Sequence, residues 1–180
     1  MHGIVMVQFE AFVQKNFGAE AWRALCAETR LGDRIYLPVS VYPDAEIFAL
    51  MEAAVEMTSK PAPELLGLFG EHLIPPLLET YGNPRMKSWG ALDLLENTET
   101  TIHRVVRARE PDATPPQLYC ERVSENEVEI AYRSARGLCA LALGLVRGVA
   151  TYYNEELEVH EKTCMHRGAE ACLIRARKFV

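Results

Sequence analysis

The spacing of apolar residues changes in the second half of the chain, and this change limits the fold more than any other feature. In the first half, apolar side chains such as Ile4, Val5 and Phe12 recur at helical intervals. In the second half, the short runs QLYCERV and VEIAYRS are separated by the turn-forming residues 124–126, which indicates a hairpin of two strands. Helices that precede strands in this way predict an α+β fold.

The sequence also predicts the order of these elements. Helical spacing covers six segments: one that ends before Gly18, a short one around Trp22, and the ranges 44–57, 64–81, 92–107 and 138–153. Two hairpins are expected, one over 117–134 and a second over 157–179 that turns near Gly168. We therefore expect a mostly helical N-terminal part, followed by a small antiparallel sheet and a returning helix in the C-terminal half.

Two helices carry further expectations. Asp44 opens the predicted helix over 44–57 and is a residue type that caps a helix N-terminus through its side chain. Pro75 and Pro76 lie inside the segment 64–81 and remove backbone donors. We therefore expect the prolines to bend or break that helix.

The composition indicates one compact domain over residues 1–180. With 49% hydrophobic and 24% charged residues, the chain can bury one sizeable core and is too short for two. The net charge of −6, without blocks of like charge, argues against nucleic acid and anionic membrane surfaces as partners. The N-terminus has no basic leader, and the apolar run 138–146 is too short to cross a membrane, so we expect a cytoplasmic protein.

Tyr132, Ser134 and Arg136 stand at alternate positions in the segment AYRSARGL. In an extended strand such residues point to one face, where a phenol, a hydroxyl and a guanidinium can converge on one ligand. Arginine binds carboxylates through two parallel hydrogen bonds, so this trio suits an anion. With His103 upstream in TTIHRVVR, the pattern predicts a buried cofactor that bears carboxylates, and haem is the best candidate. The polar face of a half-exposed strand would explain the alternation equally well.

These residues, with their context, resemble the haem nitric oxide/oxygen binding (H-NOX) family. The Tyr-x-Ser-x-Arg signature of the family matches the trio, its axial histidine falls on His103, and its paired proline falls on Pro115 and Pro116 in DATPPQL. The opening MHGIVMVQFEAFV and the segment FGAEAW also look like the family, so the resemblance covers nearly the whole chain. The signature alone arises by chance, but its order and spacing with His103 and Pro116 make the combination more specific.

The resemblance implies a sensor that binds haem b. His103 would be the proximal ligand of the haem iron, the trio would clamp the propionates, and Pro116 would press on the porphyrin and distort it. Residues 1–60 would cover the distal side, and residues 61–180 would supply the haem-contacting helices and the sheet. Taken alone, His103 is more simply a packed core histidine, His72 is another candidate for the axial role, and the proline pair could form only a rigid loop.

The distal pocket is expected to be apolar. In oxygen-binding members of the family a tyrosine follows the signature arginine by five residues, and this chain has Leu141 there. The other expected distal residues, Val5, Phe9 and Ile74, are also apolar. Because dioxygen is held by a hydrogen-bond donor whereas nitric oxide binds ferrous haem without one, we expect a nitric oxide sensor that also binds carbon monoxide.

The predicted activity is sensing without catalysis. Gas binding would weaken the iron bond to His103 and relax the strained haem, and the change of shape would pass to a separate protein. The resemblance implies a histidine kinase, as in two-component signalling, or a cyclic-di-nucleotide enzyme as that partner.

Three of the five cysteines predict a metal site near the C-terminus. Cys164 and Cys172 lie on opposite arms of the second hairpin, and Cys139 opens the preceding helix; three thiolates and an imidazole would complete a tetrahedral zinc site. The motif CMHRGAEAC is similar to the zinc-bearing end of some H-NOX proteins, where the fourth ligand is a histidine. That residue would be His160, although its spacing to Cys164 is one residue longer than expected, and His166 is the alternative. Without zinc, these cysteines would be a buried helical thiol and a cross-strand pair.

Two other functions stay open on the sequence alone. A thiol-based redox module would sense oxidants through the zinc site, with or without haem. An enzyme with Cys164 as nucleophile and a nearby histidine as base is less favoured, because no orienting carboxylate or oxyanion-hole loop is evident.

Overall fold

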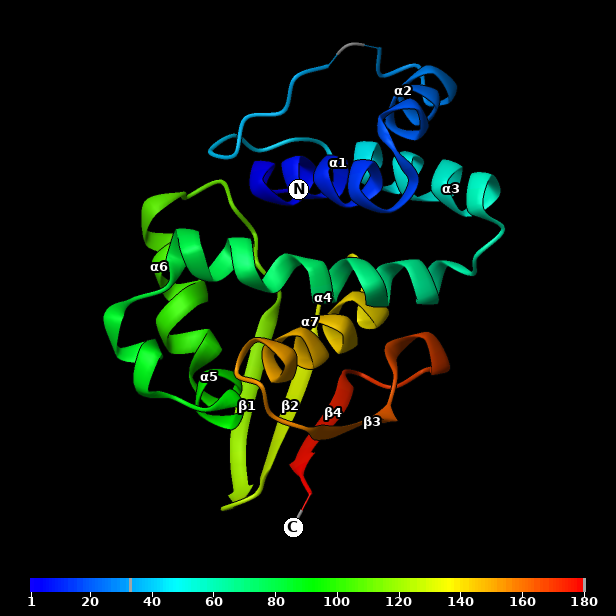
Figure 1. The fold of residues 1–180 in the computed structure, drawn as a ribbon. Coiled ribbons are helices and arrows are strands. Elements are labelled where there is room, and N and C mark those ends of the chain that lie inside the picture. The colour runs from blue at the N-terminus through cyan, green and yellow to red at the C-terminus, as the bar shows by residue number, and fades with distance from the viewer. Residues whose placement is uncertain (33, 180) are drawn as a thin grey trace.

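The computed structural model describes residues 1–32 and 34–179. Three N-terminal helices form one layer: α1 (Gly3–Phe17), α2 (Ala19–Glu28) and α3 (Asp44–Thr58). The long helix α4 (Ala62–Tyr81) crosses the middle of the molecule, with this layer on one side and the remaining helices and the sheet on the other (Figure 1). The mostly helical N-terminal part predicted from the sequence is confirmed.

The C-terminal part combines helices with a single sheet. Its elements are η1 (Pro84–Ser88), α5 (Ala91–Thr98), η2 (Glu99–His103), α6 (Arg104–Arg109), β1 (Gln117–Ser124), β2 (Glu127–Arg133), α7 (Cys139–Tyr152), β3 (Leu157–Thr163), η3 (Met165–Arg167) and β4 (Cys172–Lys178). The four strands form an antiparallel sheet in the order β1-β2-β4-β3. The α+β prediction is therefore confirmed.

Both predicted hairpins form, and α7 returns between them. β1 pairs with β2, β3 pairs with β4, and β2 with β4 joins the two hairpins, so that Tyr132 lies opposite both Leu118 and Cys172. Gly168 takes a φ of 88° in the turn before β4, a left-handed conformation that glycine adopts at little cost. The turn near Gly168 is thus where the sequence placed it.

Helix α4 contributes to two hydrophobic cores. Its first half buries Leu65 and Phe69 against the N-terminal helices. Its second half buries Ile74 and Leu78 in a core shared with α5, α7 and the inner face of the sheet. α4 therefore connects the N-terminal layer to the part of the molecule that contains the sheet.

Glycines allow α4 and α7 to approach each other closely. A Cβ on Gly144 would lie 2.1 Å from the carbonyl oxygen of Gly67, and a Cβ on Gly70 would lie 2.5 Å from the carbonyl oxygen of Leu141. Real Cβ contacts are longer than 3.0 Å, so a side chain at either position would force the helices apart.

One expectation for the helices is wrong, and a second is wrong in part. Asp44 does not cap α3, because Pro43 precedes the helix and the Asp44 carboxylate binds elsewhere. Pro75 and Pro76 do not break α4, which continues from Ala62 to Tyr81.

Among the described residues, no helix combines the length and the apolar character that crossing a bilayer requires.

Candidate functional site

His103 ends a short π-helical turn, η2, that separates α5 from α6. The backbone N–H of Arg104 donates to the carbonyl of Glu99, the five-residue spacing of a π turn. Single turns of this kind occur often at functional sites. The single helix predicted over 92–107 is therefore divided, and the division lies at the histidine that the sequence singled out.

The imidazole of His103 is largely buried, with 15% of its side chain exposed. Nδ1 lies 2.9 Å from Oε2 of Glu99, and within the described residues no hydrogen bond engages Nε2. Burial lowers the pKa of His103, and this outweighs the opposite effect of Glu99. The ring is therefore neutral near pH 7, with Nδ1 donating to the carboxylate and a lone pair available at Nε2.

Glu99 joins His103 to Arg107. One carboxylate oxygen accepts from His103, and the other forms an ion pair with the Arg107 guanidinium. Burial alone would raise the pKa of Glu99, but the contacts with His103 and Arg107 outweigh it and lower the pKa. Glu99 was not predicted from the sequence, although it lies four residues before a histidine in a helical segment, a spacing at which side chains meet.

Tyr132, Ser134 and Arg136 lie together, but not along one strand. β2 ends at Arg133, and the next residues form a turn in which the N–H of Gly137 donates to the carbonyl of Ser134 at 3.2 Å. The prediction that the trio occupies one strand is wrong, because the chain leaves the sheet after Arg133, so Ser134 and Arg136 lie beyond β2. The turn nevertheless brings all three side chains to the lining of one cavity.

The guanidinium of Arg136 links distant segments of the chain. Its Nε donates to Oδ2 of Asp44 at 2.7 Å, and its terminal nitrogens donate to the carbonyl and the hydroxyl of Thr114 at 2.6 and 2.7 Å. The other oxygen of Asp44 pairs with the amino group of Met1 at 2.6 Å. Burial would raise the pKa of Asp44, but its bonds to Met1 and Arg136 outweigh burial and lower it. Arg136 is therefore held in place by an ionised carboxylate.

Two cavities of about 130 and 190 Å³ meet at His103. His103, Pro116 and Tyr132 line both cavities, and Ser134 and Arg136 line the larger one. The structure thus brings together in one pocket a histidine with an available nitrogen and the three donors predicted from the sequence.

Most of the remaining wall of the pocket is apolar. Val5 of α1 and Leu141 of α7 line the larger cavity, and Ile74 of α4 lines the smaller one. Phe9 lines neither, because it is fully buried in the N-terminal core, where its ring contacts Phe69 at a centroid distance of 5.1 Å. A third cavity, of about 310 Å³, also touches Val5 and Leu141 and extends between α3 and α4.

Three polar side chains from different segments, His2, Tyr81 and Glu110, contact one another beside the cavity of about 190 Å³, which His2 and Tyr81 line. His2 contacts Glu110, and the Tyr81 hydroxyl donates to Glu110 at 3.3 Å. Burial raises the pKa of Tyr81 to about 12, and burial lowers the pKa of His2 despite the carboxylate beside it. The contact between His2 and Glu110 ties the start of α1 to the segment after α6, and no local pattern in the sequence predicts it.

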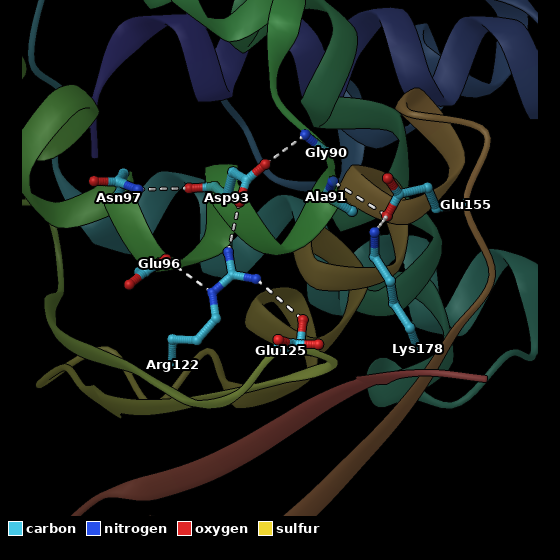
Figure 2. A network of polar contacts seen from close by, with 9 residues as sticks. All are labelled: Gly90, Ala91, Asp93, Glu96, Asn97, Arg122, Glu125, Glu155 and Lys178. Carbon is cyan, nitrogen blue, oxygen red and sulfur yellow. Dashed lines mark hydrogen bonds and ion pairs between the residues drawn. The ribbon is translucent and has the colours of Figure 1, made fainter. Parts of the chain in front are cut away.

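A polar network anchors α5, the helix that leads to His103 (Figure 2). Arg122 of β1 donates to Glu96 at 2.9 Å and to Asp93 at 2.6 Å, and Asp93 also accepts from the N–H of Gly90 at 2.8 Å. Glu155 accepts from the N–H of Ala91, the first residue of α5, at 3.3 Å, and it pairs with Lys178 of β4 at 2.9 Å. α5 is thus fastened to the sheet at its start and along its length.

Comparison with known proteins decides the family. The family model described as "Haem-NO-binding" matches residues 2–161. The chain belongs to this family. It is therefore an H-NOX domain, from a family of haem-based gas sensors, and the resemblance inferred from the sequence is confirmed.

Solved structures share the fold of this H-NOX domain. An H-NOX protein from S. oneidensis, solved in the Fe(II)NO ligation state, superposes with a TM-score of 0.92 over 100% of both chains at 24% identity. An Fe(II) unliganded H-NOX protein from K. algicida gives a TM-score of 0.85 over 100% of this chain and 97% of that one, at 22% identity.

Curated relatives are much longer proteins. Soluble guanylate cyclase 89Da from Drosophila melanogaster is 24% identical over 165 residues, which cover 89% of this chain and 24% of that protein. Soluble guanylate cyclase gcy-31 from Caenorhabditis elegans is 21% identical over 152 residues, or 83% of this chain and 22% of that protein. The H-NOX chain thus spans about a quarter of the length of these relatives.

The chemistry of the pocket fits haem, the group that this family binds. Its walls are apolar where a macrocycle would lie, and Nε2 of His103 is an available donor for iron. Arg136 uses three N–H donors on Asp44 and Thr114, and a guanidinium has five, so two remain for a carboxylate.

The H-NOX chain also gathers three thiols at the end of its sheet. Sγ of Cys172 lies 2.8 Å from Sγ of Cys139 and 3.8 Å from Sγ of Cys164. A carboxylate oxygen of Glu161 completes a group whose ligand atoms all lie within 4.8 Å of one another. Burial raises the pKa of Cys139 and of Cys172, so these thiols are protonated when no cation is bound.

The histidines expected at this cluster lie elsewhere. His160 is exposed on the outer face of β3, because strand residues alternate and Glu161 takes the inward position. His166 bonds the carbonyl of Gly137 at 2.6 Å. His72, the other candidate axial ligand, packs its ring against Phe12 at 5.6 Å and lines none of the cavities around His103.

Proposed function

We propose that this H-NOX domain is a nitric oxide sensor that holds haem b through His103 and signals to a separate protein. One observation carries the proposal: the available Nε2 of His103 and the side chains of Tyr132, Ser134 and Arg136 line the same cavity. Bound there, haem supplies a ferrous iron that takes up diatomic gases.

Different residues of the pocket would contact different parts of the cofactor. Arg136 would pair its two remaining N–H donors with a propionate, and the hydroxyls of Tyr132 and Ser134 would add directed hydrogen bonds. Burial raises the pKa of Tyr132, which keeps its phenol protonated and able to donate. Pro116 lines both cavities, and its rigid ring would set the shape of the wall against which the macrocycle lies.

Gas selectivity would come from Leu141 and Val5. Neither side chain offers a hydrogen bond, and dioxygen needs a donor to be retained whereas nitric oxide and carbon monoxide do not. The related H-NOX protein from Shewanella oneidensis has been solved in the Fe(II)NO and Fe(II)CO ligation states, which supports this choice of gases.

The signal would leave through η2. His103 ends the π turn, and α5 before it is fastened to β1 and β4 by Arg122 and Glu155. Release of His103 from the iron would let the turn and α6 move while α5 stays attached to the sheet. A histidine kinase or a cyclic-di-nucleotide enzyme would receive this change of shape.

An absorption spectrum of the reduced protein before and after nitric oxide tests the proposal. We expect a Soret band that moves when the gas binds, and no long-lived oxygen complex after exposure to air. Protein that stays colourless after expression in haem-sufficient cells and after incubation with haem would refute it.

We further propose a zinc centre at Cys139, Cys164, Cys172 and Glu161. Oε1 of Glu161 is buried without a hydrogen-bond partner among the described residues, and a cation would satisfy it. Three thiolates and a carboxylate are within the ligand set of zinc. In this proposal Glu161 would take the place of the histidine expected from the sequence, and oxidation of the thiols would release the metal, as in a redox-sensing module.

Metal analysis distinguishes this centre from a cluster of packed thiols. Protein purified without added zinc should hold one zinc per chain and lose it in Cys172→Ala, whereas Cys120→Ala, outside the cluster, should retain it. Zinc far below one per chain in the unaltered protein would refute the centre. Such a centre is compatible with a cytoplasmic protein, because thiols stay reduced there.

A further inference from the structure

The carboxylate of Glu99 bridges the ends of the π turn that carries His103. The backbone carbonyl of Glu99 accepts from the N–H of Arg104, and the side chain of Glu99 accepts from Nδ1 of His103 at 2.9 Å. The same residue therefore shapes the turn and contacts the imidazole. Glu99 is 27% exposed, so water competes for it only in part.

We infer that Glu99 positions His103 as an iron ligand, and that Arg107 limits how much the Glu99 carboxylate strengthens the bond between His103 and iron. This inference rests on the proposed function, because it concerns His103 as the axial ligand. It assigns the group that determines which ring nitrogen faces the pocket.

The first effect of Glu99 is on the tautomer. A neutral imidazole carries its proton on either nitrogen, and only the nitrogen without the proton can bind iron. An ionised carboxylate accepts and cannot donate, so it fixes the proton on Nδ1. Nε2, which lacks any partner among the described residues, is then the nitrogen with the lone pair.

The second effect is on the strength of the ligand. A carboxylate that accepts the Nδ1 proton raises the basicity of a metal-bound imidazole. Arg107 pairs with the other oxygen of Glu99 and draws negative charge away from His103. The guanidinium is 41% exposed, so water weakens this opposing effect without removing it. The two residues therefore act in opposite directions on the bond to His103.

The opposite effects of Glu99 and Arg107 distinguish a role in tuning His103 from a role in stabilising the turn alone. If Glu99 and Arg107 only stabilised the turn as an ion pair, removing either residue would have the same consequence. If they tune His103, neutralising Glu99 weakens the iron–histidine bond and neutralising Arg107 strengthens it.

The test uses haem-loaded protein in the reduced state without gas, with the iron–histidine stretching frequency read by resonance Raman spectroscopy. Glu99→Gln keeps an acceptor but removes the charge, and Arg107→Gln removes the opposing charge. We expect the frequency to fall in the first variant and rise in the second. Under nitric oxide, the ratio of detached to bound His103, read from the Soret band, should rise about tenfold in Glu99→Gln and fall in Arg107→Gln.

Three outcomes are informative. Opposite shifts in the two variants support the inference. Shifts in the same direction, or unchanged frequencies in both, overturn it while the axial role of His103 stands. The lack of any iron–histidine band in the unaltered, haem-loaded protein overturns this inference together with the proposed function.

Discussion

Replacement of Gly144 by alanine is expected to separate α4 from α7. The new Cβ would lie 2.1 Å from the carbonyl oxygen of Gly67, so the helices must move apart by roughly 0.9 Å to restore the 3.0 Å that real contacts respect. The obstacle is backbone on both sides, so no rotamer change relieves it. Overpacking of this kind costs about 3 kcal/mol at the upper end of its usual range, and the better helix propensity of alanine returns about 1 kcal/mol.

The net loss of about 2 kcal/mol corresponds to a fall in Tm of about 4–8 °C for a chain of this length. Because α7 also carries Leu141 and Leu145 into the pocket, the variant should release haem faster than the unaltered protein. Thermal unfolding followed by circular dichroism measures the first effect, and transfer of haem to an excess acceptor measures the second.

Gly67→Ala is the matched control. A Cβ there would lie 3.6 Å from Nη1 of Arg147, an ordinary contact, so only the propensity gain of about 1 kcal/mol applies. Gly67→Ala should thus be neutral or stabilising at the same helix interface. Equal Tm values for the two variants would show that close approach of the backbones does not govern this interface.

Two further predictions concern the pocket and the core. Leu141→Tyr should supply the missing hydrogen bond and slow dioxygen release by about 10–100-fold in stopped-flow measurements, whereas Leu141→Phe, which adds the ring without the hydroxyl, should not. Burial lowers the pKa of His72 in the folded protein below the 6.5 that it has in the unfolded chain. As pH falls, the unfolded chain therefore binds a proton at His72 before the folded protein does, and the free energy of unfolding should decrease below about pH 6.5. His72→Phe should reduce the loss in unfolding free energy between about pH 7.5 and 5.5 in urea titrations, and an unchanged loss would contradict the account.

The sequence predicted the elements whose signals are local. Both hairpins and α7 appear where the apolar spacing and the turn near Gly168 placed them, because strand alternation and turn chemistry act over a few residues. The π turn at Glu99 was not predictable in this way, since one extra residue in a helical turn hardly disturbs the apolar pattern of the surrounding helix. Pro75 and Pro76 were expected to bend or break α4, which continues through both prolines.

The site was predicted in its members but not in all its geometry. His103, Tyr132 and Arg136 were identified by spacing and do line one pocket, although the chain leaves β2 before Ser134. The roles given to these residues stay predictions. Partners that come from distant segments, such as Asp44 on Arg136, leave no mark on local sequence and required the structure.

The proposed zinc site shows how the alternation of side chains along a strand decides between neighbouring residues. Sequence similarity pointed to His160, but the alternation of β3 turns Glu161 toward the thiols and His160 to the outer face. A difference of one position thus exchanges an imidazole for a carboxylate.

The absorption spectrum of reduced His103→Gly, purified with and without imidazole, tests the central claim most directly. If His103 is the axial ligand, the variant should lack haem when expressed without imidazole and regain a Soret band when imidazole occupies the vacated space beside the iron. Haem retained at the level of the unaltered protein, with the same spectrum and without imidazole, would contradict the account and assign the axial role to another residue.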